Sequence, residues 1–227
     1  MPRKAYVTVM RSALIAAPVL FGAALGQDLP SPLDAALSQA EAAGPAAYAF
    51  TMTFAWTDAA PVRLRFTPGE GWRTLSGDPD ALPDDAQDAL ATVKEDEAAP
   101  GGLLYGDFRP ALRRVRLHEE TDDLITYDFE PPEAERADQE ARAAMTARLV
   151  IDKKTGGLAS YEVEATERFR PLPMVRVDAF GYEQAFETVD DGPPVLVRIR
   201  SLRRGRRMFK DVNVDFVATF TDHRRID

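Results

Sequence analysis

The chain has no cysteine among its 227 residues and only two histidines. Without cysteine, disulfide bonds, thiolate nucleophiles and thiolate metal ligands are excluded. The two histidines, His118 and His223, have no Gly-x-Ser-x-Gly elbow or His-Glu-x-x-His motif near them, so nothing marks either as a catalytic base or a metal ligand. We therefore expect no enzymatic activity, no metal site and no cofactor, and we expect both histidines at the surface or at a sheet edge.

Long apolar runs are also missing, except near the N-terminus. Arg3 and Lys4 precede an apolar stretch over residues 13–25, which closes with the small residues Ala24 and Gly26. A positive end, a short apolar centre and a small-residue exit are the parts of a secretory signal. The apolar centre is shorter than the roughly 20 residues of a membrane-spanning helix. We predict a signal peptide over residues 1–26, an uncleaved anchor being the alternative. One soluble, periplasmic domain without a membrane span should follow over residues 27–227.

Basic residues are fewer than acidic ones, 28 against 37, so the net charge is −9. Removing the three basic residues of the predicted signal would lower it to −12. This charge disfavours nucleic acid as a partner, because phosphate neutralisation dominates that binding. The basic cluster Arg203–Arg207 is expected as a hairpin tip between two strands, and it is either a solvated turn or a site for an anionic headgroup or acidic partner. The acidic pairs at 122–123 and 190–191 lack the spaced oxygen ligands of a calcium loop and are expected to be solvated turns.

Alternation of large apolar side chains with small ones gives the clearest structural signal. A period of two from Tyr48 to Trp56 predicts a β-strand with one large apolar face. Val62, Leu64 and Phe66 alternate with arginines and predict a second strand, so the two segments form a hairpin. Further strands are expected over residues 72–75, 114–118, 125–129, 145–152, 158–169, 175–180, 181–189, 195–202 and 208–221.

Helical signals are few. Pro32 follows Ser31 and opens an Ala-rich segment, and an acidic first turn at Asp84 opens a second one that runs to Glu97. The second segment has a thin apolar stripe, so we expect it to cover another element rather than fill a core. The fold class is therefore mainly β with a few helices, arranged as a sandwich or an open barrel. In a filled sandwich the large apolar residues form the core. In an open barrel they line a cavity for an apolar ligand, with the candidates Tyr48, Phe50, Met52, Phe54, Trp56, Leu64, Phe66, Tyr127, Phe129 and Phe216.

The order of these elements, together with the segment Leu149–Leu158, resembles the LolA/LolB-like periplasmic lipoprotein carriers. Within that segment, Asp152-Lys-Lys-Thr-Gly156 matches the family's "D-x-x-T-G" turn between two strands. The resemblance implies an unclosed, curved antiparallel barrel with a helical lid, here 84–97, over an apolar cavity. It also implies a cavity arginine, for which Arg63 and Arg65 are candidates by placement.

The function expected from this resemblance is a periplasmic carrier for the acyl chains of a lipid or lipoprotein. The missing cysteine matches the soluble carrier rather than the lipid-anchored acceptor. The alternative is a filled β domain that binds other envelope proteins without catalysis.

Overall fold

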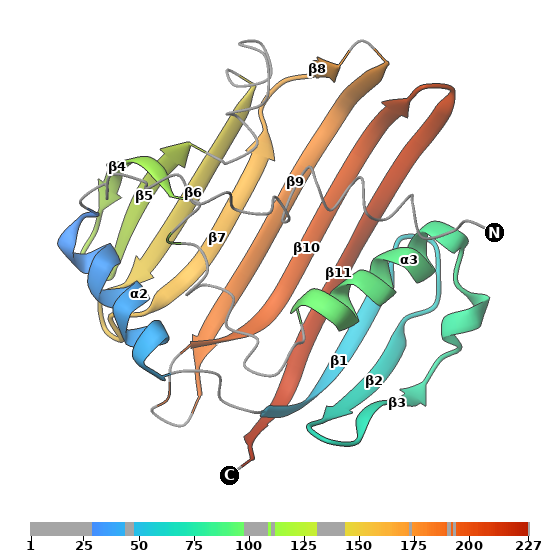
Figure 1. The fold of residues 1–227 in the computed structure, drawn as a ribbon, viewed down its shortest axis with the longest axis horizontal. Helices are drawn as coiled ribbons and strands as arrows, with labels where there is room; N and C mark the ends of the chain where they lie inside the picture. Colours follow the sequence, from blue (N-terminus) through green and yellow to red (C-terminus); the bar gives the residue numbers. More distant parts are fainter. Residues whose placement is uncertain are drawn as a thin grey trace.

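A single antiparallel sheet dominates the protein (Figure 1). The computed structural model describes residues 29–43, 48–97, 109, 112–130, 144–172, 174–189, 192 and 194–226. The predicted signal peptide and the acidic pair at 190–191 lie outside these residues. The strands are β1 (Tyr48–Trp56), β2 (Val62–Thr67), β3 (Gly71–Ser76), β4 (Arg113–Glu120), β5 (Leu124–Glu130), β6 (Met145–Asp152), β7 (Leu158–Ala165), β8 (Phe169–Leu172), β9 (Val175–Thr188), β10 (Pro194–Arg207) and β11 (Lys210–Arg225).

The strand order is β3-β2-β1-β11-β10-β9-β7-β6-β5-β4, and the short β8 pairs with β9. Most neighbours are consecutive in sequence, as hairpin connections require. There are two exceptions: β7 pairs with β9, because β8 lies off the main path, and β1 pairs with β11, which joins the first and last strands inside the sheet. The two outermost strands on the main path, β3 and β4, do not pair with each other, so the sheet stays open. This confirms the predicted fold class, a mainly β protein with an open antiparallel sheet, and excludes the two-sheet sandwich.

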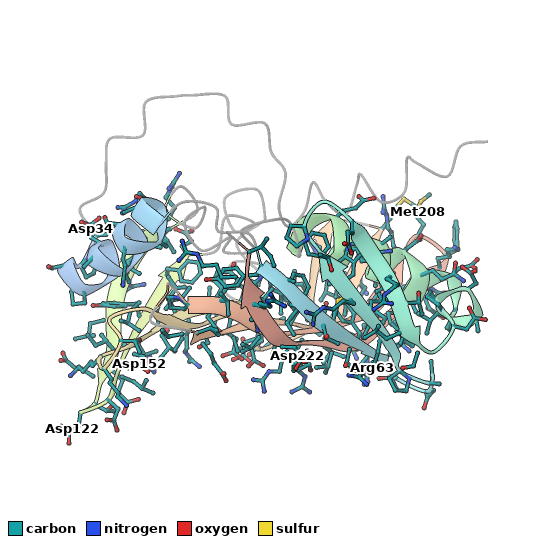
Figure 2. All side chains as sticks on the ribbon, turned by 90° about the horizontal axis from the view of Figure 1, so that it is seen from below. Asp34, Arg63, Asp122, Asp152, Met208 and Asp222 are labelled. Atoms are coloured by element: carbon teal, nitrogen blue, oxygen red, sulfur yellow. The ribbon has the colours of Figure 1, made fainter. Side chains whose placement is uncertain are left out.

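Two α-helices are described, and both lie on the same side of the sheet (Figure 2). We call this side the helix side and the other the outer side. Helix α2 (Ser31–Ala43) begins at Ser31 as predicted. Helix α3 (Asp84–Thr92) begins with two aspartates, which favour the positive end of the helix dipole, and runs into a π-helical turn, η2 (Val93–Glu97). A short 3-10 turn, η1 (Pro79–Ala81), precedes α3.

Each helix turns an apolar stripe toward the sheet. In α2 the buried residues are Leu33, Ala36, Leu37 and Ala40, the i, i+3, i+4 spacing of one helical face. The predicted thin stripe of the second helix is confirmed by the burial of Leu82, Ala86, Leu90 and Val93. The side chains of both helices and of the sheet form one continuous apolar core.

Four strand predictions are corrected by the structure. Residues 158–169 were expected as one strand, but β7 ends at Ala165 and β8 begins at Phe169. Residues 175–189 were expected as two strands, but β9 is continuous through Gly181, which pairs with Leu202 of β10 and Glu164 of β7. Arg203–Arg207 was expected as a hairpin tip, but it is the end of β10. Met208, expected as the first residue of the last strand, instead lies in the turn before β11. Period-two patterns locate strands well, but they do not show where two long strands turn.

Candidate functional site

The helix side of the sheet brings together the residues predicted to line a cavity. Eight of the ten come from β1, β2 and β11, where Phe50 pairs with Phe66 and Trp56 pairs with Phe216. The rings of Phe54 and Phe216 lie 5.0 Å apart, centroid to centroid. Trp56 is half-buried, and the other nine are at most 9 % exposed. The parity of the strands therefore placed all ten on the correct face.

The remaining two candidates, Tyr127 and Phe129, lie at the other end of the sheet. They belong to β5, which is separated from β11 by β10, β9, β7 and β6. At about 4.8 Å per strand, this corresponds to roughly 24 Å along the sheet. The ten residues thus lie in two parts of one face, at the two ends of a single continuous apolar core.

The helices lie over these two ends. Helix α2 packs near β6, and α3 lies on the side of β1 and β2 (Figure 1). The π-helical end of α3 is held by Lys94, whose ammonium lies 5.8 Å from the centroid of the Trp72 ring, within the range of a cation–π interaction. No described helix lies over the middle of β9 and β10.

Half-buried apolar and aromatic residues that were not predicted as site residues lie here. We call this part of the helix side the middle strip, and its residues are Tyr161, Phe180, Tyr182 and Val214. Tyr161 of β7 stands 6.3 Å from Tyr182 of β9 and 5.7 Å from Phe129, measured between ring centroids. Phe180 and Val214 continue the strip toward the far ends of β9 and β11, and both pack against the core. The alternation of Phe180 and Tyr182 with small or polar residues was present in the sequence. It was divided there between two expected strands, so the continuous face was not recognised.

Two polar side chains of β9 and β10 are buried on the helix side, Gln184 and Ser201. Ser201 of β10 has no exposed surface, and it pairs with Tyr182 on one side and Phe216 on the other. Its hydroxyl has no hydrogen-bond partner in the structure. A buried hydroxyl without a partner costs about 1–3 kcal/mol. This position is therefore able to donate a hydrogen bond to a ligand oxygen at little further cost.

The outer side of the sheet has a different chemistry. Arg148, Glu162, Glu183 and Arg200 are neighbours along one line across β6, β7, β9 and β10. Burial raises the pKa of Glu162, and the nearby carboxylates of Glu164 and Glu183 raise it further. Glu183 is paired with Arg198. This side is thus a charged surface and not a continuation of the apolar face.

Arg63 and Arg65 belong to this outer side, so the prediction that one of them serves as a cavity arginine is wrong. They alternate with the buried residues of β2, and Figure 2 shows Arg63 on the side away from the helices. Arg65 donates a hydrogen bond from Nη1 to Thr51 Oγ1, 3.1 Å away. Arg203, by contrast, shares the register of helix-side residues, since it pairs with Phe180 and Val214.

The two histidines differ in environment. His118 is exposed, as predicted, and its Nδ1 lies 2.8 Å from Asp128 Oδ2. His223 was expected at the surface or at a sheet edge, and it is half-buried near the end of β11. Its ring lies between those of Tyr48 and Phe50, with centroids 6.4 and 6.0 Å away.

Burial lowers the pKa of His223, although a hydrogen bond between Nε2 and the Leu196 carbonyl oxygen, 3.1 Å away, acts in the opposite direction. A bulge in β11, with Asp222 at a φ of 55°, turns the histidine toward the rings. His223 also borders a shallow hollow together with Glu187, Arg198 and Thr221.

The described residues contain no cluster of three or more histidine, aspartate or glutamate side chains placed to hold a metal ion. The exposed pair at residues 122–123 lies in the turn between β4 and β5, as expected for a solvated turn. None of the described helices has the length and apolar character needed to cross a membrane.

No protein-family model, no curated protein and no solved structure matches the chain. Its function is therefore argued from its own geometry, and the resemblance to LolA/LolB-like carriers stays a prediction.

The turn that carries this resemblance is a capped hairpin between β6 and β7. Asp152 Oδ1 accepts hydrogen bonds from the backbone N–H groups of Lys154, at 2.7 Å, and Thr155, at 3.2 Å. Gly156 adopts a φ of 69°, which glycine tolerates without strain. The motif thus has a local structural role in this chain, independent of any ligand.

Proposed function

We propose that the protein is a periplasmic carrier that holds the acyl chains of a lipid or lipoprotein against the helix side of its sheet. The observation that carries this proposal is the apolar face that runs from β3 to β5 under only two described α-helices. A closed barrel or a two-sheet sandwich would cover such a face permanently. An open sheet with a helix at each end allows one helix to move and a ligand to take its place.

The free-energy cost of opening the helix is close to the gain from burying an acyl chain in its place. Lifting α3 together with its flanking turns would expose three large side chains, Leu82, Leu90 and Val93, at roughly 1.5–3 kcal/mol each. An acyl chain gains roughly 0.8 kcal/mol for each methylene group it buries. About eight buried methylene groups therefore offset the opening of α3. The Lys94–Trp72 contact adds only a modest further cost of opening. Because the total cost is low, α3 is the candidate lid.

The middle strip supplies the features that distinguish an acyl chain from a plain hydrocarbon. Tyr161, Tyr182 and Phe180 offer half-buried aromatic surface between the two helices. The unpartnered hydroxyl of Ser201 lies among them, where it would donate a hydrogen bond to the ester or amide carbonyl of the cargo. The acyl tail would then lie along the core toward β1 or β5.

The test is the uptake of a fluorescent fatty acid by the purified protein, together with native mass spectrometry of protein isolated from the periplasm. Val214→Glu places a charge on the helix side, and Asn213→Glu places the same charge on the neighbouring, outward-facing position. We expect Val214→Glu to lose uptake and Asn213→Glu to retain it, with both variants folded by circular dichroism. Extra mass on the native protein would identify the cargo class.

A filled β domain that binds another envelope protein is the second candidate. The observation in its favour is the complete burial of Met52, Phe54 and Ile199, whose side chains pack against protein. Folded wild-type protein that has no bound lipid and takes up no apolar probe would decide for this candidate and against the carrier.

A further inference from the structure

The far ends of β9, β10 and β11 extend beyond the rest of the sheet (Figure 1). The pairing of β7 with β9 ends at Gly181, and the pairing of β1 with β11 ends at Phe216. From there the strands continue with the short β8 at their edge. The six residue-to-residue steps from Gly181 to Val175 span about 20 Å at about 3.3 Å per step. The result is a projecting ribbon, which ends in the turn between β10 and β11.

The tip of this ribbon is apolar and exposed. Met208 and Phe209 form the turn, with exposed fractions of 57 % and 84 %. Met174, 55 % exposed, lies beside them, because the Met208 N–H donates a hydrogen bond to the Met174 carbonyl oxygen, 2.6 Å away. Phe209 is the most exposed of the large apolar residues that the structure describes. We call Met174, Met208 and Phe209 the apolar tip.

The backbone geometry of the turn does not explain why large apolar residues stand at these positions. Tight hairpin turns favour glycine, asparagine or aspartate, because these residues tolerate a positive φ. Met208 adopts a φ of 55°, which a methionine side chain disfavours. The turn therefore has two large apolar side chains in water at a place where polar turn residues would be more stable. Strain and exposure together at one turn indicate a binding function.

Basic side chains surround the apolar tip. Arg207 pairs with Lys210 across the hairpin, and Arg206 pairs with Arg176 of β9. Like charges placed directly opposite each other destabilise a sheet. In the part of the chain that the structure describes, neither Arg207 nor Lys210 has an ion-pair partner. Asp211 offers partial compensation to Arg206, with its Oδ1 3.6 Å from Nε. The tip is thus locally positive on a chain whose net charge is −9.

We propose that this ribbon docks the protein on the surface of an anionic lipid bilayer. The apolar tip enters the headgroup region and contacts the upper part of the acyl chains, and Arg207 and Lys210 bind lipid phosphates. A lipid surface matches both features of the tip, since it offers apolar depth for Phe209 and dispersed negative charge for the basic side chains around it. The inference goes beyond the proposed carrier function and does not require any cargo.

The electrostatic contribution of the basic side chains and the apolar contribution of the tip to membrane binding should be separable by experiment. A basic residue near an anionic surface contributes about 1 kcal/mol, or roughly a five-fold change in binding. Arg207→Gln with Lys210→Gln should therefore weaken binding roughly 30-fold at low salt, and added salt should reduce the difference. Lys154→Gln with Arg224→Gln, which removes the same charge elsewhere on the surface, is the matched control and should change binding far less.

The absence of cysteine permits a direct test of insertion. Phe209→Cys and, as a control, Leu117→Cys each create a single site for an environment-sensitive fluorophore. Leu117 is 57 % exposed and lies on β4, at the other end of the sheet. With vesicles of phosphatidylcholine and phosphatidylglycerol, we expect the label at position 209 to brighten and shift to the blue, and the label at position 117 to stay unchanged. Vesicles of phosphatidylcholine alone should give a much weaker response.

Three outcomes would overturn the proposal. The first is no vesicle binding by the wild-type chain at low salt. The second is an equal response from the labels at positions 209 and 117, which would indicate unspecific adsorption. The third is cross-linking from position 209 to an acidic envelope protein without any binding to anionic vesicles, which would make the partner a protein. Phe209→Ser provides an independent check, since it should weaken vesicle binding and leave the thermal unfolding midpoint unchanged.

Discussion

Phe54 of β1 and Phe216 of β11 join the first and last strands of the chain through rings whose centroids are 5.0 Å apart. Phe54 has no exposed surface, and Phe216 has 7 %. Because β1 pairs with β11 inside the sheet, this contact connects the β1–β3 part with the β4–β11 part. It is the contact on which we expect the cohesion of the sheet to depend most.

Phe54→Ala should lower the free energy of unfolding by about 3–5 kcal/mol, since it leaves a cavity in a packed core. Urea denaturation followed by circular dichroism measures this change. Adding Phe216→Ala should cost less than the sum of the two single substitutions, because the two rings share one contact. The control is Arg63→Ala on the outer side, which should change stability by about 0.5 kcal/mol or less. Strict additivity of the two phenylalanine substitutions would show that the contact does not couple the strands.

His223 should make the protein less stable in mild acid. Its pKa is lowered in the folded state from the ordinary value of 6.5, so the unfolded chain binds the proton more readily. Its contribution to stability is therefore fully present above pH 6.5 and is lost as the pH falls through its folded-state pKa. His223→Gln should flatten the fall in unfolding free energy below neutral pH, as measured by urea titrations at several pH values. His118→Gln is the matched control, and an identical effect from both substitutions would contradict the assignment.

Glu162 should oppose folding when it is charged. Its pKa is raised by burial and by the neighbouring Glu164 and Glu183, so the folded state binds its proton more readily than the unfolded chain does. Glu162→Gln should therefore raise the free energy of unfolding at neutral pH, and the gain should shrink as the pH falls through the folded-state pKa. Thermal unfolding at neutral and acidic pH tests this. The exposed Glu119→Gln serves as the comparison, and a gain that does not depend on pH would argue against the charge explanation.

Asp152 should stabilise the β6–β7 hairpin through its two backbone hydrogen bonds. Asp152→Ala should cost about 1–2 kcal/mol, whereas Asp152→Asn should retain most of the stability because its side-chain oxygen still accepts hydrogen bonds. Hydrogen exchange at Lys154 and Thr155 would localise the change. Loss of lipid uptake by a fully stable Asp152→Ala protein would instead show a role for this turn in cargo binding.

The sequence predicted the local structure well. Alternation from Tyr48 to Trp56 located β1 and the face it buries, and the start of α2 at Ser31 followed from the proline after it. The Asp152 turn was recognised from its own residues. These features depend on neighbours within a few positions along the chain, where side-chain period and turn chemistry act directly.

The sequence by itself determined the fold class, the position of most strands and the apolar face that carries the ten candidate residues. The tertiary structure alone decided the pairing of β1 with β11, the roughly 24 Å separation of the two apolar ends, the partial burial of His223 and the exposure of Phe209 at a ribbon tip. Strand parity specifies the face on which a side chain lies, but it contains no information on which distant strand lies beside it. That choice depends on the packing of the whole sheet, and here it placed the candidate lipid-facing residues on two separate surfaces, the helix side and the apolar tip.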